Sequence, residues 1–278
     1  MFDLNIVIVN YHNKDDVAKV IGSILFDLAS SNLKAHIAVV DNSQNQDGVK
    51  AVLSQFGEQV RYVDAKRNIG YGRACNLGFK SVPARYYFIC NPDNIILPQS
   101  KTFERLIRFL EQNLQVGAVG PKLVYPSGAL QYTCCRFDRP SILIKPLKQM
   151  GWHNKYEWIA KHADRLLMKD FEHDKTQPVD WVIGSAIMIR GDALDKIRGF
   201  DERYFMYLED CDLCQGLWEN GFPVYYMHDV IVEHRYTRES AEVPGIFSAL
   251  IKNRLARAHF FSWIKYLWKW RKLHKYYA

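Results

Sequence analysis

Cysteine is scarce in this sequence, and the few copies are not spaced for cross-linking. Only 6 of the 278 residues are cysteine, and two of them, Cys134 and Cys135, are neighbours in the chain. A disulfide framework is typical of short secreted chains with many separated cysteines, so that class of protein is excluded. Cys211 and Cys214 have the spacing of a zinc pair, but no second Cys or His pair accompanies them, and we expect both to pack inside a helix. The composition predicts a reducing compartment.

Long apolar runs are also absent. No window reaches about 18 uninterrupted apolar residues, so the sequence predicts no helix that spans a membrane. The apolar run from Leu4 to Val9 follows Asp3 directly and lacks the basic start and the cleavage site of a signal peptide. From these two absences we expect a cytoplasmic protein.

Acidic residues are missing from the end of the sequence. Between Val243 and Ala278 there is no Asp or Glu, whereas Lys and Arg interleave with aromatic residues, and the net charge of +7 favours an anionic partner. This composition is typical of a helix in the headgroup region of an anionic bilayer. It also fits single-stranded nucleic acid, or a helix that packs on the domain with its basic face in solvent. We expect residues 241–278 to form a basic amphipathic helical extension that associates with the inner face of the cell membrane, not with nucleic acid.

The first half of the sequence alternates short apolar runs with segments of helical periodicity. With 48% hydrophobic and 24% charged residues, the composition is that of an ordinary globular protein. Strands and helices in alternation predict an α/β fold with a mostly parallel sheet covered on both faces. No repeat or linker divides the chain, and the fold of the basic, aromatic insertion at 137–177 is not predicted. We expect strands at 4–9, 36–40, 60–63, 86–90, 119–124, 181–190 and 229–232, and helices at 17–28, 72–80, 100–112 and after residue 207.

Polar residues collect where three of the expected strands end. They are the segments 10–13, 41–43 and 91–94. Each segment taken singly is explained by the turn-forming residues that normally follow a strand. The three together favour a ligand site, because ligands of parallel sheets bind beyond the carboxyl ends of the strands.

Asp93, in the sequence Asn-Pro-Asp, could coordinate a divalent cation. Mg²⁺ or Mn²⁺ needs only one or two protein carboxylates when substrate phosphates supply the other oxygens. A plain turn is the alternative for this tripeptide. His234 follows a strand-like segment and could add a metal ligand or a phosphate contact, although a lone histidine is more often structural. The metal hypothesis therefore names Asp93 and His234.

The stretch 68–76 contains two glycines, but it does not match a dinucleotide fingerprint. Cys75 stands where the third glycine would be, and the stretch follows the third strand rather than the first. A Rossmann oxidoreductase is therefore disfavoured. Gly70 and Gly72 permit a close approach of a ligand to the backbone, and Arg73 could face a phosphate. A turn followed by a helix cap is the alternative.

Three acids, Glu209, Asp210 and Asp212, crowd the start of an expected helix. On that helix Asp210 shares a face with the apolar residues at 213, 214 and 217, because residues three and four apart are neighbours. The helix N-terminus favours a carboxylate anion, whereas burial and the neighbouring acids oppose it. These opposed effects could keep Asp210 ionised yet basic. A simple helix cap is the alternative.

A series of motifs occurs in one order along the chain: IVIVNYHN, VVDNS, NIGYGRACNLGF, NPDN, GPKL, WVIGSAIMIR and GFDERYFMYLEDCDLCQGLWENGF. This series resembles the family 2 glycosyltransferases of GT-A fold, particularly the bacterial rhamnosyltransferase-like branch. The resemblance covers about residues 4 to 240. It implies a GT-A domain at 1–240, with a donor half at about 1–120 and an acceptor half at about 121–240, followed by the basic tail at 241–278.

The resemblance also implies roles for individual residues. Asp210 matches the general base, and Glu209 would orient that base or the acceptor. Asp93 stands at the metal-binding end of the family's Asp-x-Asp motif, in which Asn91 replaces the first acid, and His234 matches a histidine near the diphosphate. Together with Arg73, the residues expected at the nucleotide sugar are Asn10, Asp41 (near base or ribose), Asn68, Gly70, Asn91 and Arg254.

Trp181 and Gly184 are expected on the acceptor side of the site. A flat indole suits the face of a sugar ring, although a core position for Trp181 is an equal alternative. Taken together, these residues predict an inverting, metal-dependent hexosyltransferase. The favoured reaction moves L-rhamnose from dTDP-rhamnose onto a polyprenyl-diphosphate-linked glycan, in polysaccharide or O-antigen assembly.

Three alternatives to this reaction remain. A UDP-sugar could be the donor instead of a dTDP-sugar. A sugar nucleotidyltransferase would need a Gly-rich, basic loop after the first strand, which residues 10–14 do not provide. A non-catalytic carbohydrate-binding or nucleotide-binding module would tolerate the loss of Asp93 and Asp210, and both acids are present.

Overall fold

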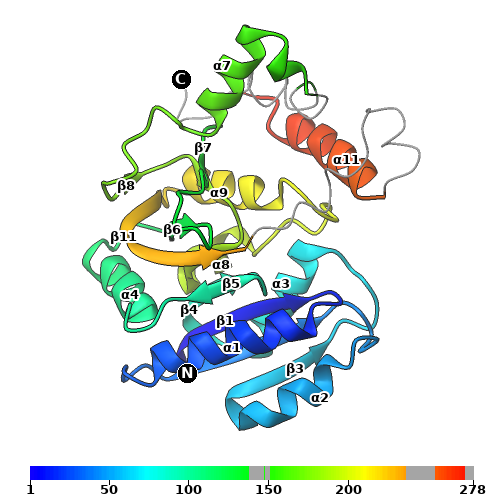
Figure 1. Ribbon diagram of the computed structural model, residues 1–278, viewed down its shortest axis with the longest axis vertical. Coiled ribbons are helices and arrows are strands. Elements are labelled where there is room, and N and C mark those ends of the chain that lie inside the picture. Colours follow the sequence, from blue (N-terminus) through cyan, green and yellow to red (C-terminus); the bar gives the residue numbers. More distant parts are fainter. Residues whose placement is uncertain (138–146, 148–150, 236–253, 273–278) are drawn as a thin grey trace.

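The chain is built around one curled sheet with helices on both faces (Figure 1). The computed structural model describes residues 1–137, 147, 151–235 and 254–272. The boundary expected at 240 lies outside these residues. The strands are β1 (Phe2–Asn10), β2 (Ala35–Asp41), β3 (Val60–Asp64), β4 (Ala84–Cys90), β5 (Asn94–Ile96), β6 (Ala118–Val124), β7 (Cys134–Cys135), β8 (Gln177–Pro178), β9 (Trp181–Val182), β10 (Ala186–Arg190) and β11 (Val224–His234).

The expected helices of the first half are present, each shifted by less than one turn. Shorter helices occur where the sequence shows too few periodic residues to predict one. The helices are α1 (Lys14–Leu28), α2 (Val49–Leu53), α3 (Tyr71–Ser81), α4 (Thr102–Gln112), α7 (Glu157–Leu166), α8 (Gly191–Ile197), α9 (Glu209–Glu219) and α11 (Arg254–Lys269), with 3-10 turns η1 (Ser54–Gln59) and η2 (Trp152–Asn154).

The main sheet has the strand order β3-β2-β1-β4-β10-β6-β11-β5, with β8 beside β11. β1, β2, β3 and β4 are parallel to one another, whereas β10 runs antiparallel to both of its neighbours, β4 and β6. β5 and β8 are antiparallel to β11. The expectation of a mostly parallel sheet is confirmed, and the carboxyl ends of β1, β2 and β4 meet at one edge.

Each face of the sheet forms a separate apolar layer. Ile6 and Ile8 of β1 belong to the buried cluster that contains α1, α2 and α4. Val7 and Val9 belong to the opposite cluster, which contains α3, α8 and α9. Because side chains alternate across a strand, a strand covered on both faces is apolar at nearly every position. This explains the nearly continuous apolar run near the start of the sequence.

The prediction of one strand at 181–190 is wrong, because this segment forms two strands, β9 and β10. β9 pairs with β7 in a small antiparallel sheet, and β10 pairs with β4 and β6 in the main sheet. Residues 183–185 separate them, and their backbone groups turn toward the start of α9 and the end of β4. Gly184 and Ser185 interrupt the apolar residues at this point, and a glycine inside a strand pattern often marks a bulge, so the sequence carried a sign of the break that the predicted strand overlooked.

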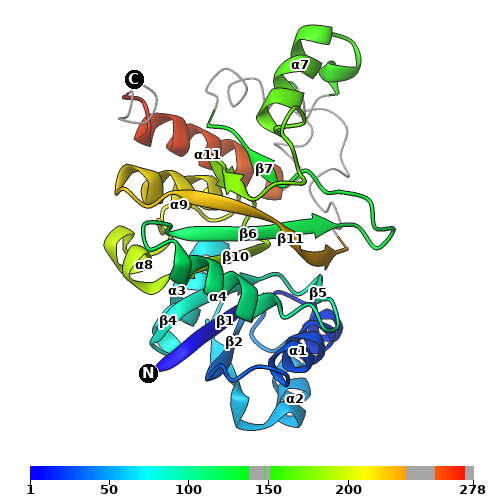
Figure 2. The same ribbon diagram turned by 90° about the vertical axis from the view of Figure 1, so that its left-hand side faces the viewer.

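α9 is enclosed on more than the one face that helical periodicity predicts. Leu213, Cys214 and Leu217 are buried as expected, and Glu209 and Asp212 are buried as well. The additional cover comes from α11, which lies along α9 on the side away from the main sheet (Figures 1 and 2). One face of the basic tail helix therefore packs on the domain.

The remaining features of the described chain agree with its composition. All six cysteines are buried free thiols, so the absence of a disulfide framework is confirmed. Within the insertion at 137–177, η2 and α7 lie at the same end of the molecule as α11 (Figure 1). Among the helices that the structure describes, none combines the length and the apolar character needed to cross a bilayer.

Candidate active site

The break between β9 and β10 joins the start of α9 to the end of β4. The Gly184 amide donates to Oδ2 of Asp210 at 3.0 Å. The next carbonyl, of Ser185, accepts from the Asn91 amide at 2.8 Å and from Nδ2 of Asn94 at 2.5 Å. A Cβ at position 184 would lie 3.1 Å from the Cβ of Asp210, so glycine permits this close approach. The expected base and the expected metal turn are therefore held by two consecutive residues.

Tyr71, the first residue of α3, adds a second connection between these parts. Its hydroxyl lies 2.7 Å from Oδ1 of Asn91 and 2.9 Å from the Gly184 carbonyl oxygen. Burial, with a smaller contribution from the Cys75 thiol and then Glu209, raises the pKa of Tyr71 well above its ordinary value. The hydroxyl therefore stays protonated and shares one hydrogen between the two oxygens.

Asp210 stands at the first turn of α9, and its orientation is fixed by backbone amides. Oδ1 accepts from the Cys211 amide at 2.8 Å, while Oδ2 accepts from Gly184. The turn before the helix is tight, because Tyr207 and Leu208 both have positive φ angles of 71° and 64°. Asp210 is half-buried, so its carboxylate can be reached from outside the core. This is the placement that a general base needs.

Asp93 and His234 meet where β5 pairs with β11. Nε2 of His234 lies 3.3 Å from Oδ2 of Asp93. Gln131 Nε2 donates to the His234 carbonyl oxygen, which leaves Oε1 of the same amide facing Nδ1 of His234 at 2.8 Å. Nδ1 must therefore carry a hydrogen, and in the neutral imidazole Nε2 presents its lone pair to the carboxylate. Two facing acceptors fit a cation or a proton between them.

Asp93 and His234 could together coordinate a divalent metal ion, and a nucleotide diphosphate would supply further ligands to the same ion. Carboxylate and imidazole are both ligands of Mn²⁺, and Mg²⁺ accepts a single carboxylate with phosphate oxygens. In the part of the chain that the structure describes, no group of three or more His, Cys, Asp or Glu side chains is arranged to hold a metal ion by itself. The diphosphate would thus have to complete the coordination.

At the ends of β1 and β2, Asp41 organises a buried polar cluster. Its carboxylate accepts from the Ser43 hydroxyl at 2.6 Å, the Tyr62 hydroxyl at 2.9 Å and the Asn45 amide at 2.5 Å. Burial by itself raises the pKa of Asp41, but the bonds from Ser43 and Tyr62 outweigh it, so the pKa lies below its ordinary value. The carboxylate is ionised, and it holds the loop after β2.

Asn10 extends this cluster to the loop after β1. Its Nδ2 lies within 3.3 Å of oxygens of Asp41, Ser43 and Asp47, and its Oδ1 accepts from the Asn13 amide. Asn10 and Asp41 are both fully buried. The two buried side chains therefore hold the loops that follow β1 and β2 by hydrogen bonds from inside the protein.

The turn before α3 is held by Asn42 and by Phe205. The Asn42 side chain accepts from the Ile69 amide at 3.1 Å and donates to the Gly70 carbonyl at 3.2 Å. Asn68 closes the turn, because its Oδ1 accepts from the Gly70 amide. The Tyr71 amide donates to the Phe205 carbonyl, in the loop that leads to α9. This turn places the hydroxyl of Tyr71 beside the site.

Replacing Gly70 with Ala is expected to destabilise the fold strongly. Gly70 has a φ of 89°, and a Cβ there would lie 2.3 Å from the Phe205 carbonyl oxygen. Strain and overlap together should cost more than about 2 kcal/mol in the free energy of unfolding, measured by urea denaturation. Gly128→Ala is the matched control, because Gly128 has a φ of 80° but nothing within 4 Å of its Cβ position. Equal losses in the two variants would contradict the role given to the Phe205 contact.

Comparison with known proteins decides the family. The sequence profile of the family described as "Glycosyltransferase like family 2" matches residues 3–258. The chain belongs to glycosyltransferase family 2. Its catalytic class is therefore glycosyl transfer, as the motif series implied.

Two relatives of this family 2 glycosyltransferase share similar lengths of sequence with it. The N-acetylglucosaminyl-diphospho-decaprenol L-rhamnosyltransferase of Mycobacterium tuberculosis is 28% identical over 223 residues, which is 75% of this chain and 69% of the relative. A low-salt glycan biosynthesis hexosyltransferase of Haloferax volcanii is 24% identical over 218 residues, 76% of this chain and 60% of the relative. These relatives support the rhamnosyltransferase-like branch.

Solved structures show that this family 2 glycosyltransferase has the GT-A fold. S. aureus TarS 1-349 in complex with UDP-GlcNAc aligns with a TM-score of 0.58 at 12% identity, over 87% of this chain and 62% of the other. GalNAc-T7 with UDP, GalNAc and Mn²⁺ aligns with a TM-score of 0.63 at 9% identity, over 96% and 48%. This chain spans less than two thirds of either structure, and at these identities the likeness concerns the fold alone.

Three expected site residues of the glycosyltransferase lie away from the junction at Gly184. Arg73 donates from Nε to the Glu202 carbonyl at 2.7 Å and so supports the loop before α9. Trp181 is 6% exposed, and its indole N–H donates to the Arg136 carbonyl, which agrees with the core alternative. Arg254 lies over the ring of Phe205, 5.1 Å from its centre.

Two residues that the sequence did not single out connect the site of the glycosyltransferase. Tyr71 stands between Gly70 and Gly72. Those glycines suggested a close approach of a ligand to the backbone, and no role was predicted for the tyrosine hydroxyl. Asn42 follows Asp41 in a turn whose residue types are common after any strand. Neither residue type is distinctive in the sequence, and only the fold shows that Tyr71 and Asn42 both contact the turn before α3.

Proposed function

We propose that this glycosyltransferase is an inverting enzyme that moves L-rhamnose from dTDP-rhamnose to a polyprenyl-diphosphate-linked glycan. The observation that carries this proposal is the arrangement around Gly184 and Ser185, which holds Asp210 next to the turn that bears Asp93. A base on one side and a pair of metal ligands on the other suit direct displacement at the anomeric carbon. The name of the Mycobacterium tuberculosis relative supports the sugar and the lipid-linked acceptor.

The proposed step begins at the acceptor hydroxyl. Its oxygen attacks the anomeric carbon while Asp210 takes its proton, and the bond between that carbon and the diphosphate oxygen breaks with both electrons going to the diphosphate. Inversion follows because attack and departure occur on opposite faces of the sugar. The amides of Gly184 and Cys211 keep the Asp210 carboxylate pointed in one direction during the proton transfer.

The departing diphosphate gathers negative charge and needs a cationic environment. Asp93 and His234 would hold a Mg²⁺ or Mn²⁺ ion that neutralises this charge when it is bound. Gln131 holds His234 through both of its amide atoms, because Oε1 faces Nδ1 of the imidazole ring and Nε2 donates to the backbone carbonyl of His234. Such support of a ligand's ring is a general requirement of metal sites, since it fixes the tautomer.

We also propose that α11 binds an anionic membrane surface, where a lipid-linked acceptor would lie. The outer side of α11 exposes large apolar side chains, with Phe261 56% and Trp268 61% exposed, next to Phe260 and Ile264. The sequence from 243 to 278 contains no acid that would be repelled by anionic lipid. Aromatic side chains at the interface with nearby Lys and Arg are the chemistry of peripheral binding.

The test is transfer by the purified full chain to a synthetic polyprenyl-diphospho-N-acetylglucosamine in anionic vesicles. dTDP-rhamnose and a panel of UDP-sugars are compared, with mass spectrometry of the glycolipid and NMR of the new anomeric centre. Rhamnose transfer with inversion supports the proposal. Transfer from a UDP-sugar alone would overturn the donor assignment, and retention would overturn the mechanism. Equal activity in anionic and uncharged vesicles would overturn the membrane assignment.

Replacing Tyr71 with Phe is expected to lower kcat/KM by about tenfold. The variant removes the one hydroxyl shared by Asn91 and Gly184, and a lost buried hydrogen bond costs about 1–3 kcal/mol. Tyr87→Phe is the matched control, because its buried hydroxyl accepts from the Ala84 amide far along β4. The Tm of the two variants should fall similarly, while only Tyr71→Phe loses activity. Equal activity in both would contradict a positioning role for Tyr71.

A further inference from the structure

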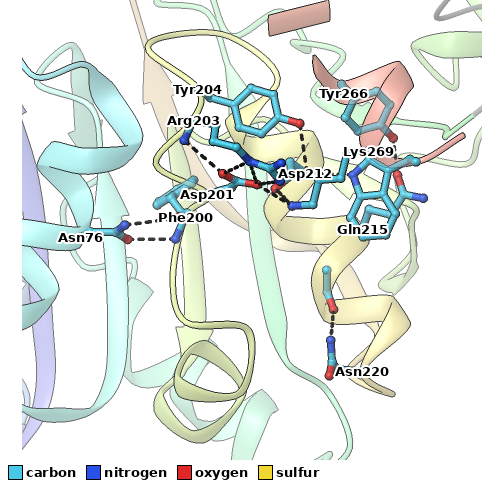
Figure 3. A network of polar contacts seen from close by, with 12 residues as sticks. Asn76, Phe200, Asp201, Arg203, Tyr204, Asp212, Gln215, Asn220, Tyr266 and Lys269 are labelled. Carbon is cyan, nitrogen blue, oxygen red and sulfur yellow. Dashed lines mark hydrogen bonds and ion pairs between the residues drawn. The ribbon is translucent and has the colours of Figure 1, made fainter. Parts of the chain in front are cut away.

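A buried ion cluster joins α11 to the first turn of α9 (Figure 3). Lys269, at the end of α11, places Nζ 2.7 Å from Oδ2 of Asp212 and 2.9 Å from Oδ2 of Asp201. The Asp212 side chain is 3% exposed and that of Asp201 is 14% exposed. One ammonium group therefore bridges two carboxylates that come from different segments.

Other groups close the cluster from several sides. Asp212 Oδ1 accepts from the Trp270 indole at 2.7 Å and from the Tyr204 hydroxyl at 3.2 Å. Arg203 donates from Nε to Asp201 at 2.9 Å, so Asp201 keeps a second cation. Asp212 has Lys269 as the only cation among the contacts that the structure gives for it. Its charge therefore depends on α11.

Removing the ammonium group would leave Asp212 in an unfavourable position. Burial raises the pKa of Asp212, and Lys269 and Trp270 act in the opposite direction. Asp201 is close enough to add repulsion, and Glu209 and Asp210 occupy the same helical turn. A buried carboxylate that loses its partner either takes up a proton or moves toward water. A carboxylate that stays charged and moves toward water would shift the first turn of α9.

Asp210 lies in that turn, two positions before Asp212. The Asp212 amide donates to the Leu208 carbonyl at 2.9 Å, which is the first helical bond of α9. α11 has two further contacts near this turn, since the Tyr266 hydroxyl donates to Gln215 and the Ser262 hydroxyl donates to the Met206 carbonyl at 2.8 Å. Asp212 and Asp210 face different neighbours but lie in the same helical turn. A rotation of that turn would therefore move both carboxylates at once.

We propose that Lys269 is a positioning residue for glycosyl transfer, which acts through Asp212 to hold the first turn of α9 and, with it, Asp210. This inference rests on the proposed function in that Asp210 is taken as the base. It extends that function to a residue of the basic tail, which the sequence predicted to contact the membrane, with packing on the domain as an alternative. Lys269 touches neither donor nor acceptor, and its effect is on the orientation of the reacting carboxylate.

The first test compares kcat with donor affinity in three single variants. Lys269→Met is expected to lower kcat by about 10- to 100-fold, because a small misplacement of a catalytic group has an effect of that size. The Kd for dTDP, measured by calorimetry, should change by less than about twofold, since the Asn91 and Asp93 turn is intact. Lys269→Arg should recover much of the rate. Lys265→Met, which removes the same charge from α11 but only a bond to the Arg203 carbonyl, should keep the rate within about twofold.

The second test needs no substrate and so separates this inference from the proposed function. Amide hydrogen exchange of residues 208–214 should be about tenfold faster in Lys269→Met than in Lys265→Met, while exchange in α1 stays the same. Adding Asp212→Asn to Lys269→Met removes the isolated charge and should restore protection and part of the rate. Unchanged exchange, or a rate equal to that of Lys265→Met, overturns the inference. If the wild type transfers no sugar, the proposed function fails and the exchange result still decides the role of Lys269.

Discussion

Replacing Asp210 with Asn is expected to lower kcat for glycosyl transfer by about 10²- to 10⁴-fold, the range that general-base catalysis contributes. The amide cannot take the acceptor proton. It also offers only one oxygen to the two backbone amides, of Gly184 and Cys211, that now bind the two carboxylate oxygens. We expect the loss in kcat, measured with saturating donor, and little change in the Kd for dTDP.

The control for this variant is Asp195→Asn, an exposed acid on α8. It makes the same chemical change and should keep kcat within about twofold, as most surface substitutions do. The Tm of Asp210→Asn must also be measured, because the Gly184 contact contributes to the fold. Transfer by Asp210→Asn at the wild-type rate would exclude Asp210 as the base and would leave Glu209 as the nearest acid on α9.

Replacing Asp93 with Asn is expected to lower kcat/KM by about 10²-fold. A cation at the diphosphate stabilises the transition state by several kcal/mol, and a tenfold change in rate corresponds to about 1.4 kcal/mol. Asp93 is the carboxylate that faces the lone pair of His234, so its loss removes half of the donor pair. Rates with dTDP-rhamnose are measured over a titration of MnCl₂.

Binding gives an independent measurement for Asp93. In the wild type, dTDP should bind more tightly with MnCl₂ than without, and Asp93→Asn should lose this difference while its affinity for dTMP stays unchanged. Asp195→Asn again serves as the control. If the wild type binds dTDP equally with and without MnCl₂, the pair of Asp93 and His234 does not use a metal ion in binding.

The fold of the first half followed from local pattern. Strands that are buried on both faces are apolar at nearly every position, and α1 and α4 have strong helical spacing, so their positions could be predicted. Polar segments after the strands predicted the edge at which the site forms. Residue type and the resemblance both suggested that Asp93 and His234 could share a metal ion, but local pattern could not establish that they are adjacent, because they are far apart in the sequence and meet through the pairing of β5 with β11.

The parts that could not be predicted depend on contacts between distant segments. The break at Gly184 is marked in the sequence only by the pair Gly184-Ser185, and the partners that its backbone groups bind could not be predicted. In the sequence, Asp212 is one of three acids at the start of a helix. The structure shows that Asp212 faces Lys269 of α11, whereas Asp210 faces Gly184. Periodicity gives the direction of a side chain relative to its own helix, not the identity of its neighbour.

The docking of α11 on α9 has a consequence for biosynthesis of the enzyme. Lys269 follows Asp212 by 57 residues and Asp201 by 68, so the cation that neutralises them is translated after the rest of the described chain is nearly complete. Chains fold progressively as they emerge from the ribosome. The sheet can assemble early, but Asp212, on the helix that carries the proposed base, lacks the hydrogen bond from its ammonium partner until residue 269 has been added. Nascent chains should therefore acquire nucleotide binding before they acquire transferase activity.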